Sequence, residues 1–246
     1  MKKKFLFLLM LLAIPVAAFA SEEGGPPLDK APINIDDKLS LQRGARTFVN
    51  YCLNCHSAAA MRYNGLEELG LTEAQIKGNL MFAADKVGES MTVGMSKKDA
   101  KQWLGAAPPD LSVISRSRGA DWIYTYLRSF YRDPTRPTGW NNVVFEKVGM
   151  PHVLYQLQGT QVLETEKEKS AEGKEVEIHK LVLEKPGKMT VPEYDAMVGD
   201  LVNYLVWMGE PTKSFRQHVG IIVILFLLFM LIPAYYLKKE FWKDVH

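Results

Sequence analysis

The sequence contains little cysteine and little histidine. Of its 246 residues, two are cysteine and five are histidine. Cys52 and Cys55 lie in one short stretch, so a disulfide between them would close a loop of only a few residues and would restrict the unfolded chain little. A thioredoxin-like redox pair is also disfavoured, because the strand–helix–strand context that it requires is absent around these cysteines.

Long apolar runs are confined to the two ends of the chain. Three lysines precede a mostly apolar stretch from Phe5 to Phe19, which ends in the small-residue site Ala18-Phe19-Ala20. This pattern predicts a secretory signal peptide over residues 1–20. A first membrane anchor is the alternative, although the stretch is short for spanning a bilayer. Removing the three lysines changes the formal charge from +2 to −1, which leaves no strongly basic surface and argues against nucleic-acid binding.

The second apolar run, from Val219 to Leu237, holds 19 residues without a formal charge. As a helix it would reach about 28 Å, close to the thickness of the hydrocarbon core of a bilayer. A buried core helix is the alternative, but little protein remains near the chain end to cover it. The run predicts a single membrane anchor in lipid over residues 216–237. The lysines beyond it place a tail of residues 238–246 inside the cell and residues 21–215 outside.

Local patterns between these runs predict a mostly helical domain. Ser40 is a candidate cap for a helix that runs through Leu41 to Cys52, and Asp121 is a candidate cap for a helix over Trp122 to Tyr131. The proline- and glycine-containing stretch from Arg132 to Asn142 predicts a loop.

The sequence after this loop predicts an insertion and a further helix. Partial alternation of apolar and polar residues within Thr160 to Lys185 predicts a solvated β-hairpin, with its turn at Ala171-Glu172-Gly173. Thr190 and Glu193 then have the spacing of a capping box, which predicts a further helix.

The chemical signal is the stretch Cys52-Leu53-Asn54-Cys55-His56. Two thiols at this spacing can reach both vinyl groups of a haem, and the histidine directly after the second thiol places an imidazole beneath the iron. Cys-x-x-Cys-His is therefore typical of c-type haem attachment. The predicted export agrees with this, because the attachment is made outside the cytoplasm in bacteria. One motif predicts one covalent haem c, with His56 as a metal ligand.

The residues alone leave the second iron ligand open. Candidates in the exported part are His152, His179 and several methionines, among which Met150 is distinguished by its neighbours. Gly149 permits a close approach to a flat cofactor, and Pro151 biases Met150 toward an extended loop. His152 is the rival ligand, and Met150 as a core residue is the alternative to ligation. Ligation by His and Met would raise the haem's potential relative to two histidines.

Taken together, these residues resemble the cytochrome c1 family of the cytochrome bc1 complex (ubiquinol–cytochrome c reductase), in its bacterial form. The resemblance covers nearly all of the exported chain and rests on a combination of motifs. These are Arg43-Gly44, Tyr51 to His56, Met61-Arg62-Tyr63, Pro108 to Ser112 with Arg116 and Arg118 after it, Gly149-Met150-Pro151, and the C-terminal anchor.

The resemblance implies further site residues. Met150 would be the sixth ligand of the iron. The arginine that closes the Pro-Pro-Asp-Leu-Ser stretch would meet a haem propionate, for which Arg118 is the first candidate and Arg116 the second, because a guanidinium binds a carboxylate through two hydrogen bonds. Pro109 and Leu111 would line the haem pocket.

The fold implied is mainly α, a cytochrome-c-like haem domain with a small β-hairpin insertion and one C-terminal transmembrane helix, on the periplasmic side of a bacterial inner membrane. The resemblance implies electron transfer from a Rieske iron–sulfur protein to a soluble cytochrome c, beside cytochrome b, with no substrate chemistry on this chain. Two other classes stay open: a haem enzyme with an open sixth site, and a haem subunit of a different membrane oxidase. The insertion at residues 160–185 leaves the docking face for the acceptor undefined.

Overall fold

The computed structural model describes residues 26–169 and 175–244, so the predicted signal peptide and the predicted hairpin turn lie outside the described residues. Its α-helices are α2 (Lys38–Thr47), α3 (Glu73–Asn79), α4 (Lys97–Leu104), α5 (Ile114–Arg118), α6 (Ala120–Arg128), α7 (Tyr155–Gln158), α8 (Val191–Gly209) and α9 (Lys213–Phe241). A π-helical turn, η2 (Phe48–Cys52), continues α2, and η3 (Tyr63–Leu69) is a 3-10 helix.

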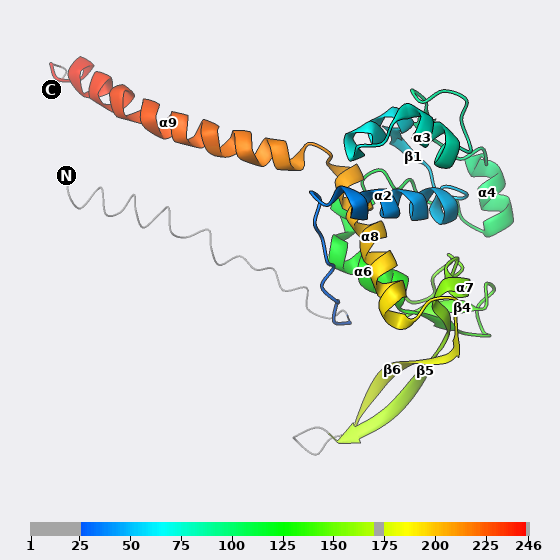
Figure 1. Cartoon of the computed structure of the whole chain (residues 1–246). Coiled ribbons are helices and arrows are strands. Elements are labelled where there is room, and N and C mark those ends of the chain that lie inside the picture. Colours follow the sequence, from blue (N-terminus) through cyan, green and yellow to red (C-terminus); the bar gives the residue numbers. More distant parts are fainter. Residues whose placement is uncertain (1–25, 170–174, 245–246) are drawn as a thin grey trace.

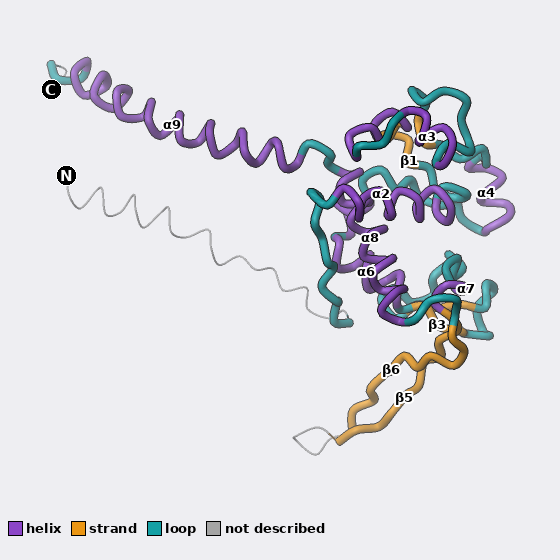
Figure 2. Tube along the Cα trace, viewed as in Figure 1, coloured by secondary structure: helices purple, strands orange, loops and turns teal. Residues whose placement is uncertain are grey.

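Within the described ranges, the strands form three small antiparallel pairs (Figures 1 and 2). They are β1 (Ala58–Arg62) with β2 (Ser90–Met91), β3 (Phe130–Arg132) with β4 (Trp140–Asn142), and β5 (Gly159–Lys169) with β6 (Glu175–Pro186). The predicted fold class is confirmed: the chain is mainly helical, with small sheets and an apolar C-terminal helix.

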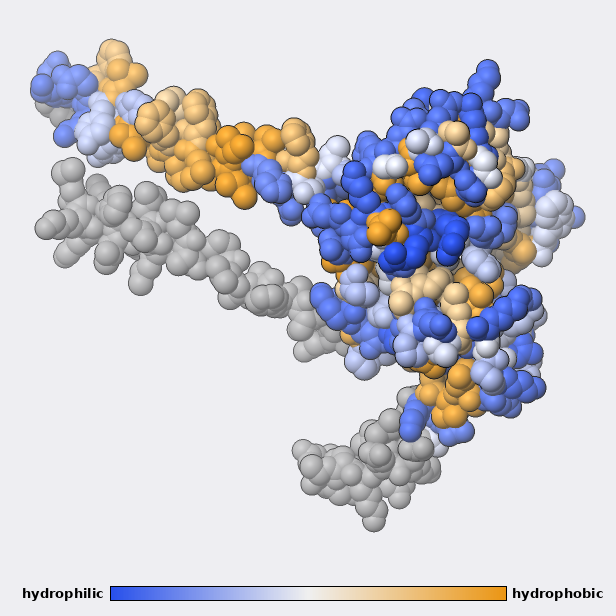
Figure 3. Space-filling view, viewed as in Figure 1, coloured by the Kyte–Doolittle hydropathy of each residue, from blue (hydrophilic) through white to orange (hydrophobic). Residues whose placement is uncertain are grey.

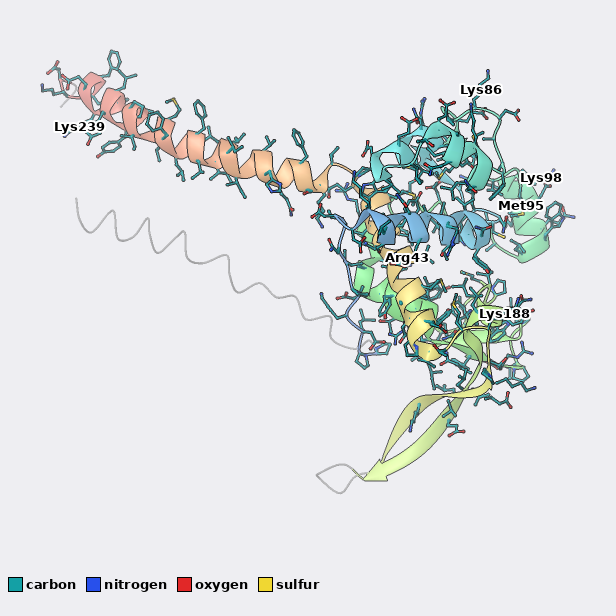
Figure 4. The ribbon with its side chains drawn as sticks, in the orientation of Figure 1. Arg43, Lys86, Met95, Lys98, Lys188 and Lys239 are labelled. Carbon is teal, nitrogen blue, oxygen red and sulfur yellow. The ribbon has the colours of Figure 1, made fainter. Side chains whose placement is uncertain are left out.

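Packing of α2 against α8 forms the centre of the main core. Arg43 on α2, labelled in Figure 4, forms two hydrogen bonds with the carboxylate of Asp200 on α8, at 2.6 and 3.0 Å. The rings of Phe48 and Tyr204 lie 5.6 Å apart, and both side chains are fully buried. This pairing holds the end of α2, and with it the cysteine motif, on a rigid base.

Two predicted helix starts are wrong, and hydrogen bonds show why. Asp37 caps α2, because its carboxylate accepts the backbone N–H groups of Leu39 and Ser40 at 3.1 Å. Ser40 is instead buried, where its hydroxyl accepts from Asn203. Asp121 lies in the first turn of α6, which begins after Gly119, and its carboxylate accepts the backbone N–H of Ala31 at 2.9 Å.

The predicted end of α6 and the predicted loop after it also need correction. The helix ends at Arg128 rather than Tyr131, because residues 130–132 pair with residues 140–142 as β3 and β4. Arg128 is held there by Asp195 on α8, with hydrogen bonds of 2.6 and 2.9 Å, and by Asp29 at 2.6 Å. These ion pairs join α6, α8 and the segment that precedes α2.

The predicted hairpin and the predicted capping box are confirmed. Strands β5 and β6 pair over their whole described length and extend away from the body of the molecule (Figure 1). Thr190 and Glu193 exchange capping-box hydrogen bonds at the start of α8. Since both features depend on residues close together in sequence, local patterns were sufficient to predict them.

Helix α9 extends beyond the domain, and its side chains are exposed along its length. Its most apolar window has a mean hydropathy of 2.6, and Pro233 lies within the helix. Figure 3 shows apolar side chains along α9 and hydrophilic ones at its far end, where Figure 4 labels Lys239. An exposed apolar helix of 29 residues is long enough to serve as a single membrane anchor.

Candidate functional site

The cysteine motif occupies the turn that ends the α2–η2 helix. The N–H groups of Cys55 and His56 donate to the carbonyl of Cys52, at 3.1 and 2.8 Å, which curls the motif into a compact turn. Leu53 points into the core, whereas Cys52, Cys55 and His56 are each partly exposed and both thiols are free. Burial, with the nearby Cys55, raises the pKa of the Cys52 thiol to about 12.

His56 is oriented by the Pro-Pro-Asp-Leu-Ser stretch. Its Nδ1 lies 2.7 Å from the carbonyl oxygen of Pro109, and because a carbonyl only accepts, Nδ1 carries the proton. This leaves Nε2 as the nitrogen with a free lone pair, the arrangement usual for a metal-binding histidine. Burial lowers the pKa of His56, opposed by the Pro109 hydrogen bond and the charge of Asp110, so the imidazole is neutral and able to bind a metal.

Asp110 fixes this stretch beside the motif. Its carboxylate accepts the N–H of Ala59 at 2.9 Å and that of Ser112 at 2.8 Å, and Leu111 donates its own N–H to the carbonyl of Ser57 at 2.8 Å. Burial acts to raise the pKa of Asp110, but the hydrogen bonds from Ser112 and Ala59, with the charge of Lys97, outweigh it and the pKa is lowered. Pro109 and Leu111 are therefore held next to the cysteine motif, and their role in lining a haem pocket stays a prediction.

Met150 belongs to a different group of side chains. It lies in the loop between β4 and α7, is partly exposed, and packs with Tyr126 against the small cluster of Phe130, Trp140 and Val148. The hydroxyl of Tyr126 donates to the Met150 sulfur at 3.5 Å. No interaction between Met150 and the cysteine motif is described in the structure, so its role as the sixth ligand stays a prediction.

The rival ligand, His152, lies in the same cluster and is almost fully buried. Its ring stacks on Phe130 at 4.8 Å and meets the edge of Trp140 at 5.1 Å. Burial lowers the pKa of His152 to about 4, and Gln158 opposes that shift. His152 Nε2 nevertheless has no hydrogen-bond partner in the described part of the chain. These contacts place His152 as a neutral side chain packed between aromatic rings. For His179, the structure describes only backbone pairing, with Thr165 in the hairpin.

Sequence reasoning did not select Trp122 and Tyr126, although their four-residue spacing on a helix was a signal that they share a face. Their rings stack at 4.9 Å with an angle of 10°, and Tyr126 meets Phe130 edge-on at 5.0 Å. We call Trp122 and Tyr126 of α6, with Phe130 at the start of β3, the aromatic ladder. Burial raises the pKa of Tyr126, so its phenol stays protonated and donates a hydrogen bond.

The two candidate arginines differ in their surroundings. The guanidinium of Arg118 lies over the ring of Trp122, 5.1 Å from its centre, and 6.0 Å from the ring of Phe145. Both arginines are exposed, and the aliphatic stem of Arg116 lies near Gly209 at the end of α8. Arg118 thus continues the aromatic ladder, which favours it over Arg116 as the partner of a propionate.

Replacing Arg118 by glutamine should lower the reduction potential of the haem by on the order of tens of millivolts, because a nearby positive charge disfavours the oxidised iron. Redox titration of the purified protein measures this. Arg116→Gln, two residues away on α5, is the matched control and should shift the potential less. An unaltered titration for Arg118→Gln would refute its role.

Fold and site together define a class: a mainly α protein with a c-type haem-binding motif and a C-terminal apolar helix. The model of the cytochrome C1 family matches residues 29–245. A relative described as cytochrome c1, from Allochromatium vinosum, is 49% identical over 99% of this chain and 100% of its own length. A protein described as ammonia monooxygenase gamma subunit, from Nitrosomonas europaea, is 51% identical over 96% of this chain and 97% of its own. A cytochrome c1 from Rhodospirillum rubrum is 29% identical over 96% of this chain.

The chain belongs to the cytochrome c1 family. It is accordingly a haem electron-transfer subunit, and the family implies haem c as its cofactor.

The donor atoms of this structure fit such a cofactor. Two free thiols three residues apart lie on one turn, and beside them stands a neutral imidazole with Nε2 free. A thioether sulfur is available at Met150, and the partly exposed rings of Trp122 and Tyr126 supply flat apolar surface. Thiols, imidazole and thioether are the groups by which proteins attach and ligate haem c.

Proposed function

We propose that this chain is the cytochrome c1 of a ubiquinol–cytochrome c oxidoreductase, accepting electrons from a Rieske iron–sulfur protein and passing them to a soluble cytochrome c. Cytochrome b is the membrane partner of the proposed complex. The bound haem c would supply one-electron redox chemistry. The residues of this chain hold it, set its potential and exclude competing ligands, and they act on no other substrate.

The hydrogen bond from His56 Nδ1 to the Pro109 carbonyl carries this proposal. It joins the cysteine motif to the Pro-Pro-Asp-Leu-Ser stretch, two of the motifs on which the family resemblance rests. It also leaves Nε2 as the ligating atom. We propose Cys52 and Cys55 as the two points of covalent attachment, and His56 and Met150 as the axial ligands of the single haem.

The proposed location follows from the chain ends. Cleavage of residues 1–20 would leave residues 21–215 as the periplasmic haem domain. Helix α9 would span the inner membrane within residues 216–237, and residues 238–246 would lie in the cytoplasm. Exposure of the whole apolar helix supports a place for it in lipid.

Covalent attachment is tested on denatured protein. Washing with acidic acetone should remove any haem that is not bonded to the chain, so the band on a denaturing gel should still show haem peroxidase stain. A double Cys52→Ala, Cys55→Ala variant should lose all of the stain. A colourless wild-type band would overturn the proposed function.

Gentle purification of the intact complex tests the partners. Recovery of cytochrome b and a Rieske protein would support the proposal. Recovery of a copper-containing oxidase or monooxygenase subunit in place of the Rieske protein would contradict it. The relative described as an ammonia monooxygenase gamma subunit makes this outcome worth testing. Carbon monoxide binding to the untreated reduced protein would favour an open-site haem enzyme.

A further inference from the structure

The hydroxyl of Tyr126 is directed at the sulfur of Met150. The oxygen and the sulfur lie 3.5 Å apart, within the longer range that hydrogen bonds to sulfur have. Within the described part of the chain, this sulfur is the only acceptor for the Tyr126 hydroxyl. A thioether sulfur has two lone pairs, so it can accept this hydrogen bond and still present the second pair to a metal.

The aromatic ladder restricts the Tyr126 ring. Trp122 stacks on one side of it at 4.9 Å, and Phe130 meets it edge-on at 5.0 Å. Trp122 and Tyr126 lie on α6 and Phe130 is the first residue of β3, so the three follow one another at four-residue spacing. The ring therefore has little room to turn, and the hydroxyl keeps its direction toward Met150.

A second contact ties the Met150 loop to the same residue of α6. The side-chain amide of Asn142 donates to the backbone carbonyl of Tyr126 at 2.7 Å. The side-chain oxygen Oδ1 of Asn142 accepts the N–H groups of Val144 at 2.9 Å and Phe145 at 3.1 Å, which shapes the loop that leads to Met150. Asn142 is fully buried, so this link is shielded from water.

We propose that Tyr126 is a positioning residue that holds the Met150 sulfur toward the haem iron and tunes its bonding. The inference rests on the proposed function, in which Met150 is the sixth ligand. A hydrogen bond to the sulfur draws electron density away from it, so the sulfur donates less to the iron. Since oxidised iron depends more on that donation than reduced iron, the hydrogen bond raises the reduction potential.

The same effect changes the competition with foreign ligands for the oxidised iron. A sulfur that donates less to the iron is displaced more easily by another ligand. Removing the hydroxyl should therefore make imidazole bind the oxidised protein roughly 3- to 10-fold more weakly, the effect expected of one hydrogen bond.

The test compares wild type with Tyr126→Phe, which removes the hydroxyl and keeps the stacked ring. The full chain in its purified complex is used for redox titration, near-infrared spectroscopy and imidazole titration. Tyr126→Phe should retain the sulfur-to-iron absorption, have a lower reduction potential and bind imidazole more weakly in the oxidised state. The matched control is Tyr124→Phe, which removes a hydroxyl from the same helix. The ring of Tyr124 packs under Arg128, so this variant should match wild type.

The outcomes distinguish a failure of the role proposed for Tyr126 from a failure of Met150 as the sixth ligand. If wild type shows the sulfur-to-iron absorption and Tyr126→Phe matches it in potential and imidazole affinity, the role of Tyr126 is overturned while Met150 stands. If wild type lacks the absorption, Met150 is not the ligand, and both the ligand assignment and the role of Tyr126 fail.

Discussion

Replacement of Met150 by leucine should abolish the near-infrared sulfur-to-iron absorption and lower the haem's reduction potential by roughly 100 mV or more. A decrease of this size is expected because reduction potentials of haems vary over about 0.8 V with the identity of the axial ligands. Leucine has a volume close to that of methionine, so the packing of Met150 against the Phe130 cluster should survive. Near-infrared spectra and redox titration of the purified protein measure the two effects.

Carbon monoxide and His152 provide the controls for this variant. The reduced Met150→Leu protein should bind carbon monoxide, because leucine offers no donor for the iron, whereas reduced wild type should not. His152→Gln should keep the sulfur-to-iron absorption, since its ring is packed between Phe130 and Trp140. Absence of the absorption in wild type, together with carbon monoxide binding to reduced His152→Gln but not to reduced Met150→Leu, would reverse the ligand assignment.

Replacement of Gly44 by alanine should destabilise the domain by about 3 kcal/mol, the upper end of the usual cost of overpacking. A Cβ at Gly44 would lie 2.1 Å from the backbone oxygen of Asp200 and 2.6 Å from the Cβ of Tyr204. Both obstacles lie on α8, and the backbone oxygen cannot rotate out of the way. Helices α2 and α8 would have to move apart, and with them the base of the cysteine motif.

Thermal unfolding, followed by far-ultraviolet circular dichroism of the full protein in detergent, measures this cost. A loss of about 3 kcal/mol corresponds to a decrease of roughly 6–12 °C in Tm for a chain of this size. Gly78→Ala in α3 is the matched control, because a Cβ there meets no atom within 4 Å. Alanine favours helix, so this control should keep or slightly raise Tm. Equal melting of the two variants would contradict the close contact of α2 with α8.

The motifs Arg43-Gly44 and Gly149-Met150-Pro151 each contain a glycine. The physical reason for glycine differs between the two positions. Gly44 is required by the approach of α8, as the contact distances show. A Cβ at Gly149 would meet no protein atom within 4 Å, so the protein itself does not require glycine there. Its predicted reason, a close approach to the flat cofactor, stays a prediction.

Errors in the helix boundaries came from competition that only tertiary contacts resolve. Ser40 and Asp37 are both good caps three residues apart, and burial of Ser40 against Asn203 leaves Asp37 as the cap. Asp121 is also a good cap by residue type, but the segment before α2 uses its carboxylate. Pairing of β3 with β4 shortened α6, and no residue within the helix signals that pairing.

The sequence by itself determined the features whose causes lie within a few residues or in composition: the cysteine motif, the capping box of α8, the hairpin and the apolar C-terminal helix. It also placed the chain in its family. Only the tertiary structure decided that Pro109 orients His56, that Gly44 admits α8, and that Tyr126 donates to the sulfur of Met150. The partners in these contacts are 53, 156 and 24 positions apart. Local propensity acts over a turn or two of chain, so such contacts depend on how the helices pack.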